Sequence, residues 1–125
     1  MIDKSSKTLI KGLDNSIIPD DGSVTSIGER AFEDCDFTSI AIPKGVTSIG
    51  EWAFFGCYSL ESITIPSSVT SIDENAFYSV RYLKDINYGG TKSQWNAISK
   101  GSDWDDYAGE NVGGYTVHCT DGDIT

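Results

Sequence analysis

Residues 46–57 read VTSIGEWAFFGC, and this stretch decides the fold because the chain repeats it. The pattern returns 23 residues later as VTSIDENAFYSV at 69–80, and it occurs 22 residues earlier as VTSIGERAFEDC at 24–35. Self-similarity with a period of about 20–50 residues is the sequence signature of repeat architectures. One such unit cannot bury its apolar residues alone, so neighbouring units must stack to complete the core. The repeat therefore predicts a stacked array.

A second recurring element lies between these blocks. It reads FTSIAI at 37–42, LESITI at 60–65 and LKDINY at 83–88. Two of its apolar positions alternate, as in a strand with one buried face. The VTSI segment predicts a second, shorter strand, and the Ala-Phe pair predicts one turn of α- or 3₁₀-helix between the two strands.

Equivalent residues of stacked units form ladders about 4.8 Å apart. The repeat predicts seven buried ladders: Val24/Val46/Val69, Ile27/Ile49/Ile72, Ala31/Ala53/Ala76, Phe32/Phe54/Phe77, Cys35/Cys57/Val80, Phe37/Leu60/Leu83 and Ile40/Ile63/Ile86. Pro19, Pro43 and Pro66 follow the longer strands, where a missing N–H ends a sheet ladder at little cost.

The pattern IPxxVTSIGxxAFxxCxxLxxI resembles the BspA-like leucine-rich repeats of bacterial surface proteins and of some protist surface proteins. The resemblance covers residues 17–88. It implies a right-handed leucine-rich repeat solenoid, mainly β with short helical turns and with its longer strands on one face. It also implies an extracellular or cell-surface location and a protein ligand, such as a host matrix protein or a protein of another cell.

We expect one domain over residues 1–125, with three repeats of 22–23 residues at 18–88. Residues 1–17, where Thr8–Ile10 and Ser16–Ile18 look like an incomplete rung, are expected to form an N-terminal cap or partial repeat. That incomplete rung favours a chain cut from a longer array over one with an irregular cap.

Residues 89–125 are expected to form a C-terminal cap. Thr91 to Gln94 is a capping box that predicts a helix start, and Lys100-Gly101 is typical of a helix end. Trp95 is expected to cover the last rung, although a Trp that stacks on a ligand is the alternative. An acidic loop at 102–114 and a strand at 115–119 follow.

Length and charge narrow the possible functions. The chain has 125 residues and a formal net charge of −10, which suits a single domain and leaves no basic stripe for nucleic-acid phosphates. The same charge disfavours docking on an anionic membrane surface. The sequence has no apolar signal-peptide core and no membrane-spanning run, so we expect no membrane insertion. A monomer is expected.

Candidate chemical sites are sparse. Cys35 and Cys57 share one ladder position, which favours two buried thiols, although rung spacing also allows a disulfide. His118 and Cys119 point to opposite faces of a strand and cannot form a catalytic pair. The acidic residues at 103–111 favour a solvated loop, with calcium binding as the alternative, because the EF-hand spacing is absent. We expect no cofactor, no metal site and no enzymatic activity.

Aromatic residues stand out at positions that carry charge or amide groups in other repeats. Trp52, for example, stands where the other copies have Arg30 and Asn75. We therefore expect a largely exposed aromatic patch that marks a partner surface. Rings that pack on one another are the alternative. The patch comprises Trp52, Phe55, Tyr58 and Tyr78.

The outward face of the longer strands is a second candidate surface. Its side chains are small, polar or charged, and they suit hydrogen bonding to a protein or a glycan. The residues predicted to contact a partner there are Glu61, Thr64, Lys84 and Asn87.

Three functions follow from these features. The first is a non-catalytic module for protein interaction or adhesion on a bacterial cell surface. The second is a structural spacer within a longer surface protein, and the third is a glycan-binding module that uses Trp52 and its neighbours.

Overall fold

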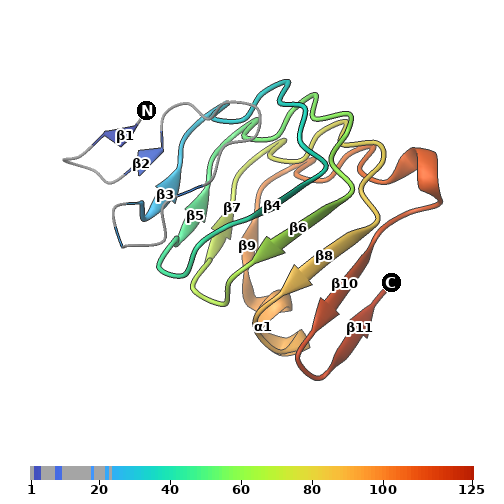
Figure 1. Cartoon of the computed structure of the whole chain (residues 1–125). Coiled ribbons are helices and arrows are strands. Elements are labelled where there is room, and N and C mark those ends of the chain that lie inside the picture. The colour runs from blue at the N-terminus through green and yellow to red at the C-terminus, as the bar shows by residue number, and fades with distance from the viewer. Residues whose placement is uncertain (1, 4–7, 10–17, 19–21, 23) are drawn as a thin grey trace.

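In the computed structural model, residues 2–3, 8–9, 18, 22 and 24–125 are described (Figure 1). Their strands form two sheets that enclose the core between them. Each repeat contributes one strand to each sheet, and one such pass is called a rung here. The first sheet has the order β1-β2-β3-β5-β7-β9, with bounds Ile2–Asp3, Thr8–Leu9, Ser26–Ile27, Ser48–Ile49, Ser71–Ile72 and Ser99–Lys100. The second has the order β4-β6-β8-β10-β11, with bounds Ser39–Ala41, Ser62–Ile65, Asp85–Tyr88, Thr116–Cys119 and Gly122–Ile124.

The pairing of the strands confirms the predicted ladders. Ile27, Ile49 and Ile72 are direct partners across three parallel strands of the first sheet. In the second sheet β4, β6 and β8 also pair in parallel, and the paired residues are 23 positions apart in the sequence. All residues of the seven predicted ladders are buried. The repeat thus builds its core from like residues in register.

Phenylalanine forms the centre of this core. The Phe54 ring stacks on Phe32 at 5.3 Å and on Phe77 at 5.1 Å between centroids, with interplanar angles of 8° and 3°. Buried aromatic rings contribute large apolar areas and favourable ring contacts. The Phe ladder therefore joins three rungs into one packed unit.

The Ala-Phe segments form turns, so the predicted turn of helix there is wrong. Each segment closes i→i+3 hydrogen bonds, such as Ala31 N–H to Gly28 O, but a left-handed residue, such as Arg30 with φ of 58°, interrupts it. Alternate N–H groups instead donate to the next rung, as Phe32 N does to Ala53 O at 2.8 Å. Bonding between rungs satisfies the backbone groups that a helix would satisfy internally.

The C-terminal region begins with α1 (Lys92–Ala97), and its predicted capping box is present. Thr91 Oγ1 accepts from Gln94 N at 3.2 Å, while Gln94 Oε1 accepts from Thr91 N at 2.8 Å. The prediction that Lys100-Gly101 ends this helix is wrong. The helix ends at Ala97 because Ile98 is extended, with φ −63° and ψ 129°, and the chain then enters β9.

The helix closes the end of the core, as predicted for Trp95. Trp95 and Ile98 are buried. Lys100 pairs with Ile72 at the ladder position of the isoleucines. Its ammonium lies 4.8 Å from the Trp95 ring centroid and donates to Trp95 O at 2.7 Å. Burial lowers the pKa of Lys100. A cation thus ends the isoleucine ladder.

The acidic segment at 102–114 is more than a solvated loop. Its first half continues the turn pattern as a further rung, because Phe77 N donates to Trp104 O at 2.7 Å and Ser79 N to Asp106 O at 2.8 Å. The Trp104 ring packs edge-on against Phe77 at 5.9 Å. A 3₁₀-helix at Glu110–Val112 follows before β10.

At the N-terminal side, β2 pairs in parallel with β3, so Thr8–Leu9 extends the first sheet by one strand. Ile18 is buried. The other residues of the predicted partial rung, Ile10 and 16–17, lie outside the described residues, as does Pro19. Among the described residues, no helix has the length and apolarity needed to cross a membrane.

Candidate binding surface

The turn side of the rungs carries an aromatic cluster. The Trp52 ring lies 5.1 Å from Phe55 and 5.4 Å from Tyr78, and Phe55 lies 5.9 Å from Tyr78. Tyr107 adds an edge-on contact to Tyr78 at 5.4 Å. The prediction that Trp52, Phe55 and Tyr78 are largely exposed is wrong, because all three are half-buried by these contacts within and between rungs.

Two arginines lie at the ends of this aromatic cluster. The Arg30 guanidinium lies over the Trp52 ring at 5.4 Å and is paired with Glu33. At the other end the Arg81 guanidinium lies over the Tyr107 ring at 4.8 Å and is paired with Glu110. The cluster is therefore a packed ridge whose ring faces are used within the chain.

Tyr58 is different, because it lines an open hollow of about 360 Å³ beside the second sheet. Tyr58 is 55% exposed and Tyr82, which lines the same hollow, is 44% exposed. The prediction of an exposed ring is confirmed for Tyr58. The full lining is Thr38, Tyr58, Ser59, Glu61, Tyr82, Lys84 and Val112.

The repeat positions the polar groups of the hollow. Glu61 N donates to Thr38 O at 2.8 Å, and Lys84 N donates to Glu61 O at 2.8 Å, so the three residues are stacked on successive rungs. Stacking places the Lys84 ammonium 3.1 Å from the Glu61 carboxylate, and both side chains are about half-exposed. The hollow therefore combines two exposed phenol rings with one acid and one base.

The predicted site residues thus separate into two groups. The structure brings Tyr58, Glu61 and Lys84 together, and Thr64 and Asn87 are exposed partners in register on the same sheet face. The other three predicted aromatics belong to the ridge.

The sequence pattern did not predict three residues of these surfaces. Tyr82 and Val112 line the hollow, and Tyr107 belongs to the ridge. Tyr82 follows Arg81 where the second repeat has Ser59 and where the first repeat is one residue shorter. An aromatic residue at this inserted position was a usable signal. Tyr107 and Val112 lie outside the repeat pattern, so the sequence contained no signal for them.

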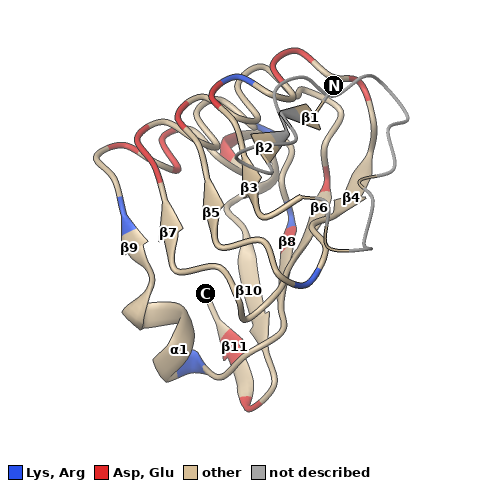
Figure 2. Ribbon diagram, turned by 90° about the vertical axis from the view of Figure 1, so that its left-hand side faces the viewer, with Lys and Arg blue, Asp and Glu red and all other residues tan. Residues whose placement is uncertain are grey.

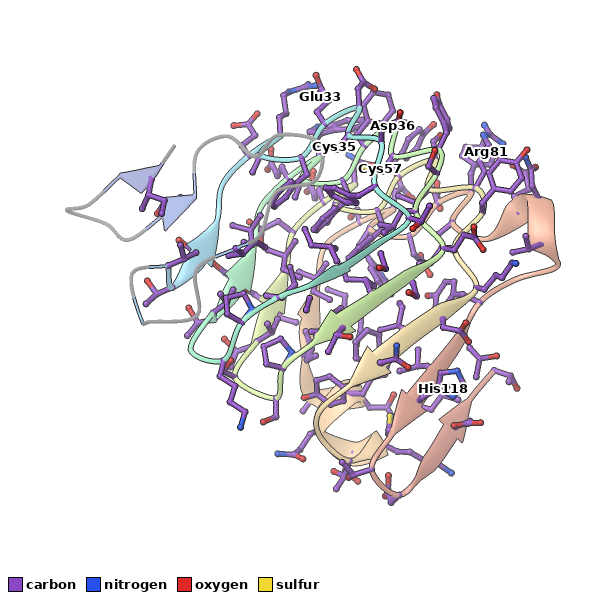
Figure 3. All side chains as sticks on the ribbon, viewed as in Figure 1. Glu33, Cys35, Asp36, Cys57, Arg81 and His118 are labelled. Carbon is purple, nitrogen blue, oxygen red and sulfur yellow. The ribbon has the colours of Figure 1, made fainter. Side chains whose placement is uncertain are left out.

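His118 on β10 connects three strands on the outward face of the second sheet (Figure 3). Its Nε2 lies 2.7 Å from Asp85 Oδ1 on β8, and its Nδ1 lies 2.9 Å from Asp123 Oδ1 on β11. These hydrogen bonds raise the pKa of His118, with the bond to Asp85 as the largest cause. Both ring nitrogens are thus engaged by carboxylates, and the group holds the last hairpin to the sheet.

The thiols are also accounted for. Cys35 and Cys57 are buried and form no disulfide, and Cys57 Sγ donates to Phe32 O at 3.0 Å (Figure 3). In the turn at 102–107, Asp105 accepts a hydrogen bond from Tyr115 Oη at 2.6 Å. Among the described residues, no group of three or more His, Cys, Asp or Glu side chains is arranged to hold a metal ion.

Short parallel strands stacked at a period of 22–23 residues and joined by turns define a repeat protein of the leucine-rich type. Residues 9–101 match the family described as "BspA type Leucine rich repeat region (6 copies)". The chain therefore belongs to the BspA-type leucine-rich repeat family. Families of this type are generally non-catalytic.

A solved structure supports the same assignment. The chain is similar to a leucine rich cell surface protein from Faecalibacterium prausnitzii, with 42% sequence identity and a TM-score of 0.55. The similarity covers 62% of this chain and 27% of that chain, so this chain matches about a quarter of the length of that protein. A comparison with curated proteins gives no match.

Proposed function

We propose that the chain is a non-catalytic module that binds a protein partner at a bacterial cell surface, through the hollow at Tyr58 and Tyr82. The observation that carries the proposal is the exposure of these two rings at 55% and 44%, beside an accessible acid–base pair. Tyrosine is enriched at energetically important interface positions because its ring offers a large contact area with few rotatable bonds.

Family membership supports this proposal. Leucine-rich repeat domains generally mediate protein interactions, and a similar solved chain is a cell surface protein. A host matrix protein or a protein of another cell is therefore the proposed class of partner, and an extracellular or cell-surface location is part of the proposal. A monomer, right-handed winding, three full repeats and the predicted domain bounds also stay predictions.

A structural spacer is the second candidate function. The outward residues near the middle of the second sheet are small and polar, such as Ser39, Ser62 and Thr64. A face of this kind offers few anchors for a tight partner. By contrast, glycan stacking on Trp52 is disfavoured, because the ring contacts Phe55 and Tyr78 and lies beneath the Arg30 guanidinium.

The experiment that tests the proposal measures binding of the purified chain to immobilised fibronectin, laminin and collagen by surface plasmon resonance. We expect saturable binding to at least one of these matrix proteins. The double variant Tyr58→Ser/Tyr82→Ser is expected to weaken it by at least about tenfold, since anchor residues contribute 2 kcal/mol or more, in order of magnitude.

The matched control is Tyr107→Ser, which removes a tyrosine of similar exposure outside the hollow. Its binding should equal that of the unmodified chain. If the double variant binds as well as the control, the hollow is not the binding site. If the chain binds none of the three matrix proteins, the spacer function is favoured instead.

A further inference from the structure

We propose that the partner reaches the hollow with an arginine- or lysine-rich segment, whose cationic group lies against Tyr58 and Tyr82 and pairs with Glu61. This inference rests on the proposed function and names the chemistry of the partner. Three observations support it: the chain's own arginine contacts, the groups that the hollow exposes, and the distribution of acidic residues.

The first observation is that the chain binds its own arginines in this way. Arg30 lies over Trp52 and pairs with Glu33, and Arg81 lies over Tyr107 and pairs with Glu110. A guanidinium is attracted both to the face of an aromatic ring and to a carboxylate. The turn side of the rungs thus twice combines a ring and an acid around one guanidinium.

The second observation is that the hollow presents the same two groups to solvent. Tyr58 and Tyr82 supply exposed rings, and Glu61 supplies the carboxylate. Glu61 already attracts a cation, because the Lys84 ammonium lies 3.1 Å away. An exposed ion pair of this kind contributes little to stability, so a guanidinium from a partner can replace the ammonium at small cost.

The third observation is the acidic charge of the chain as a whole and of its turns. The chain carries 19 acidic and 9 basic residues. Figure 2 shows Asp and Glu gathered along the turns at one edge of the two sheets, with few basic residues among them. A field of one sign attracts segments of the opposite charge and raises their association rate. A basic partner segment is therefore complementary to this edge.

The test uses a fluorescein-labelled peptide of alternating glycine and arginine, and its glycine–glutamate counterpart, in fluorescence anisotropy titrations at low salt. We expect the arginine peptide to bind and the glutamate peptide not to bind. Glu61→Gln should weaken arginine-peptide binding about tenfold, because a charge-assisted hydrogen bond is lost. Lys84→Met should strengthen it about threefold, because the competing ammonium is gone.

The matched control is Glu74→Gln, which removes the same charge from an exposed turn residue outside the hollow. Because both Gln variants change the net charge equally, a specific site is indicated only if Glu61→Gln weakens binding clearly more than Glu74→Gln. Circular dichroism spectra identical to that of the unmodified chain verify that each variant folds.

Two results would overturn the inference. One is equal binding of the arginine peptide to the unmodified chain, Glu61→Gln and Lys84→Met. The other is binding of the glutamate peptide with loss in Lys84→Met, which assigns an acidic partner to Lys84.

The two proposals fail separately. If Tyr58→Ser/Tyr82→Ser abolishes binding to matrix protein while the charge variants leave peptide binding unchanged, the proposed function stands and this inference is wrong. If the charge variants act as expected while Tyr58→Ser/Tyr82→Ser leaves matrix-protein binding unchanged, the inference stands and the proposed partner class is wrong.

Discussion

The regular rungs at 24–88 and the C-terminal region at 89–125 solve the same packing problem in different ways. In the regular rungs each buried residue meets its own equivalent, as Phe54 does between Phe32 and Phe77. In the C-terminal region two ladders end on a residue of a different kind: Lys100 follows the isoleucines of the first sheet, and Trp104 lies beside Phe77. The regular rungs thus stack like apolar residues in register, whereas the C-terminal region places residues of another chemical type at the end of these two ladders.

This difference also separates stability from function. The candidate hollow uses exposed positions of the second and third repeats, where side chains vary without disturbing the ladders beneath them. Tyr58, for example, is exposed, while the preceding Cys57 is fully buried. The regular core therefore supplies a packed base, and the variable outer positions supply the proposed binding surface.

Breaking the regular core should have the largest effect. We expect Phe54→Ala to reduce the free energy of unfolding by about 4 kcal/mol, since it leaves a cavity between two stacked rings. Urea denaturation followed by circular dichroism measures this change. The matched control Phe55→Ala, next in the chain but half-buried, should cost only about 1 kcal/mol. Equal losses would contradict the central role of the Phe ladder.

Weakening the C-terminal region should have a smaller and more local effect. Thr91→Ala removes the side-chain acceptor of the capping box and should cost about 1 kcal/mol. Amide hydrogen exchange should show faster exchange in α1, with little change at β5 and β7. Thr91→Ser keeps the hydroxyl and should restore slow exchange. Faster exchange throughout both sheets would show that the two regions are not separable in this way.

The smallest effect should come from pH, at the hairpin that ends the second sheet. Because the folded pKa of His118 is raised, its stabilising contribution is fully present below the ordinary pKa of about 6.5 and is lost as the pH rises through the folded value. Since His118 is the only histidine, one ring signal in an NMR titration reports its pKa.

Asp85→Asn provides the control for this titration. It removes the carboxylate that raises the pKa most, so the measured pKa should fall toward the ordinary value. An unmodified chain whose His118 titrates at or below about 6.5 would contradict the observed pairing.

Much of the fold could be predicted from the repeat, because equivalent residues of successive rungs lie directly beside one another. A residue such as Ile49 predicts its own neighbours, because positions 22 and 23 residues away are its partners. Where the repeat stops, this rule stops too. Lys100 resembled a helix end in sequence, but its pairing with Ile72 depends on the extended backbone at Ile98, which no local signal gave.

The candidate site was predictable only in part, for a related reason. Glu61 and Lys84 are equivalent in the repeat, so their stacking and ion pair follow from the sequence spacing. The burial of Trp52 did not follow, because a charged residue at the equivalent position, Arg30, indicated exposure. In the structure Arg30 instead covers the Trp52 ring, so a charge in one rung and a ring in the next pack together.

The most direct test of the central claim is amide chemical-shift mapping of the ¹⁵N-labelled chain titrated with the glycine–arginine peptide. If the variable outer positions of neighbouring regular rungs form the binding surface, the largest shifts should occur at Tyr58, Glu61, Tyr82 and Lys84. Shifts concentrated instead in α1, or in β10 and β11, would contradict the account, because they would place recognition in the region that ends the repeat.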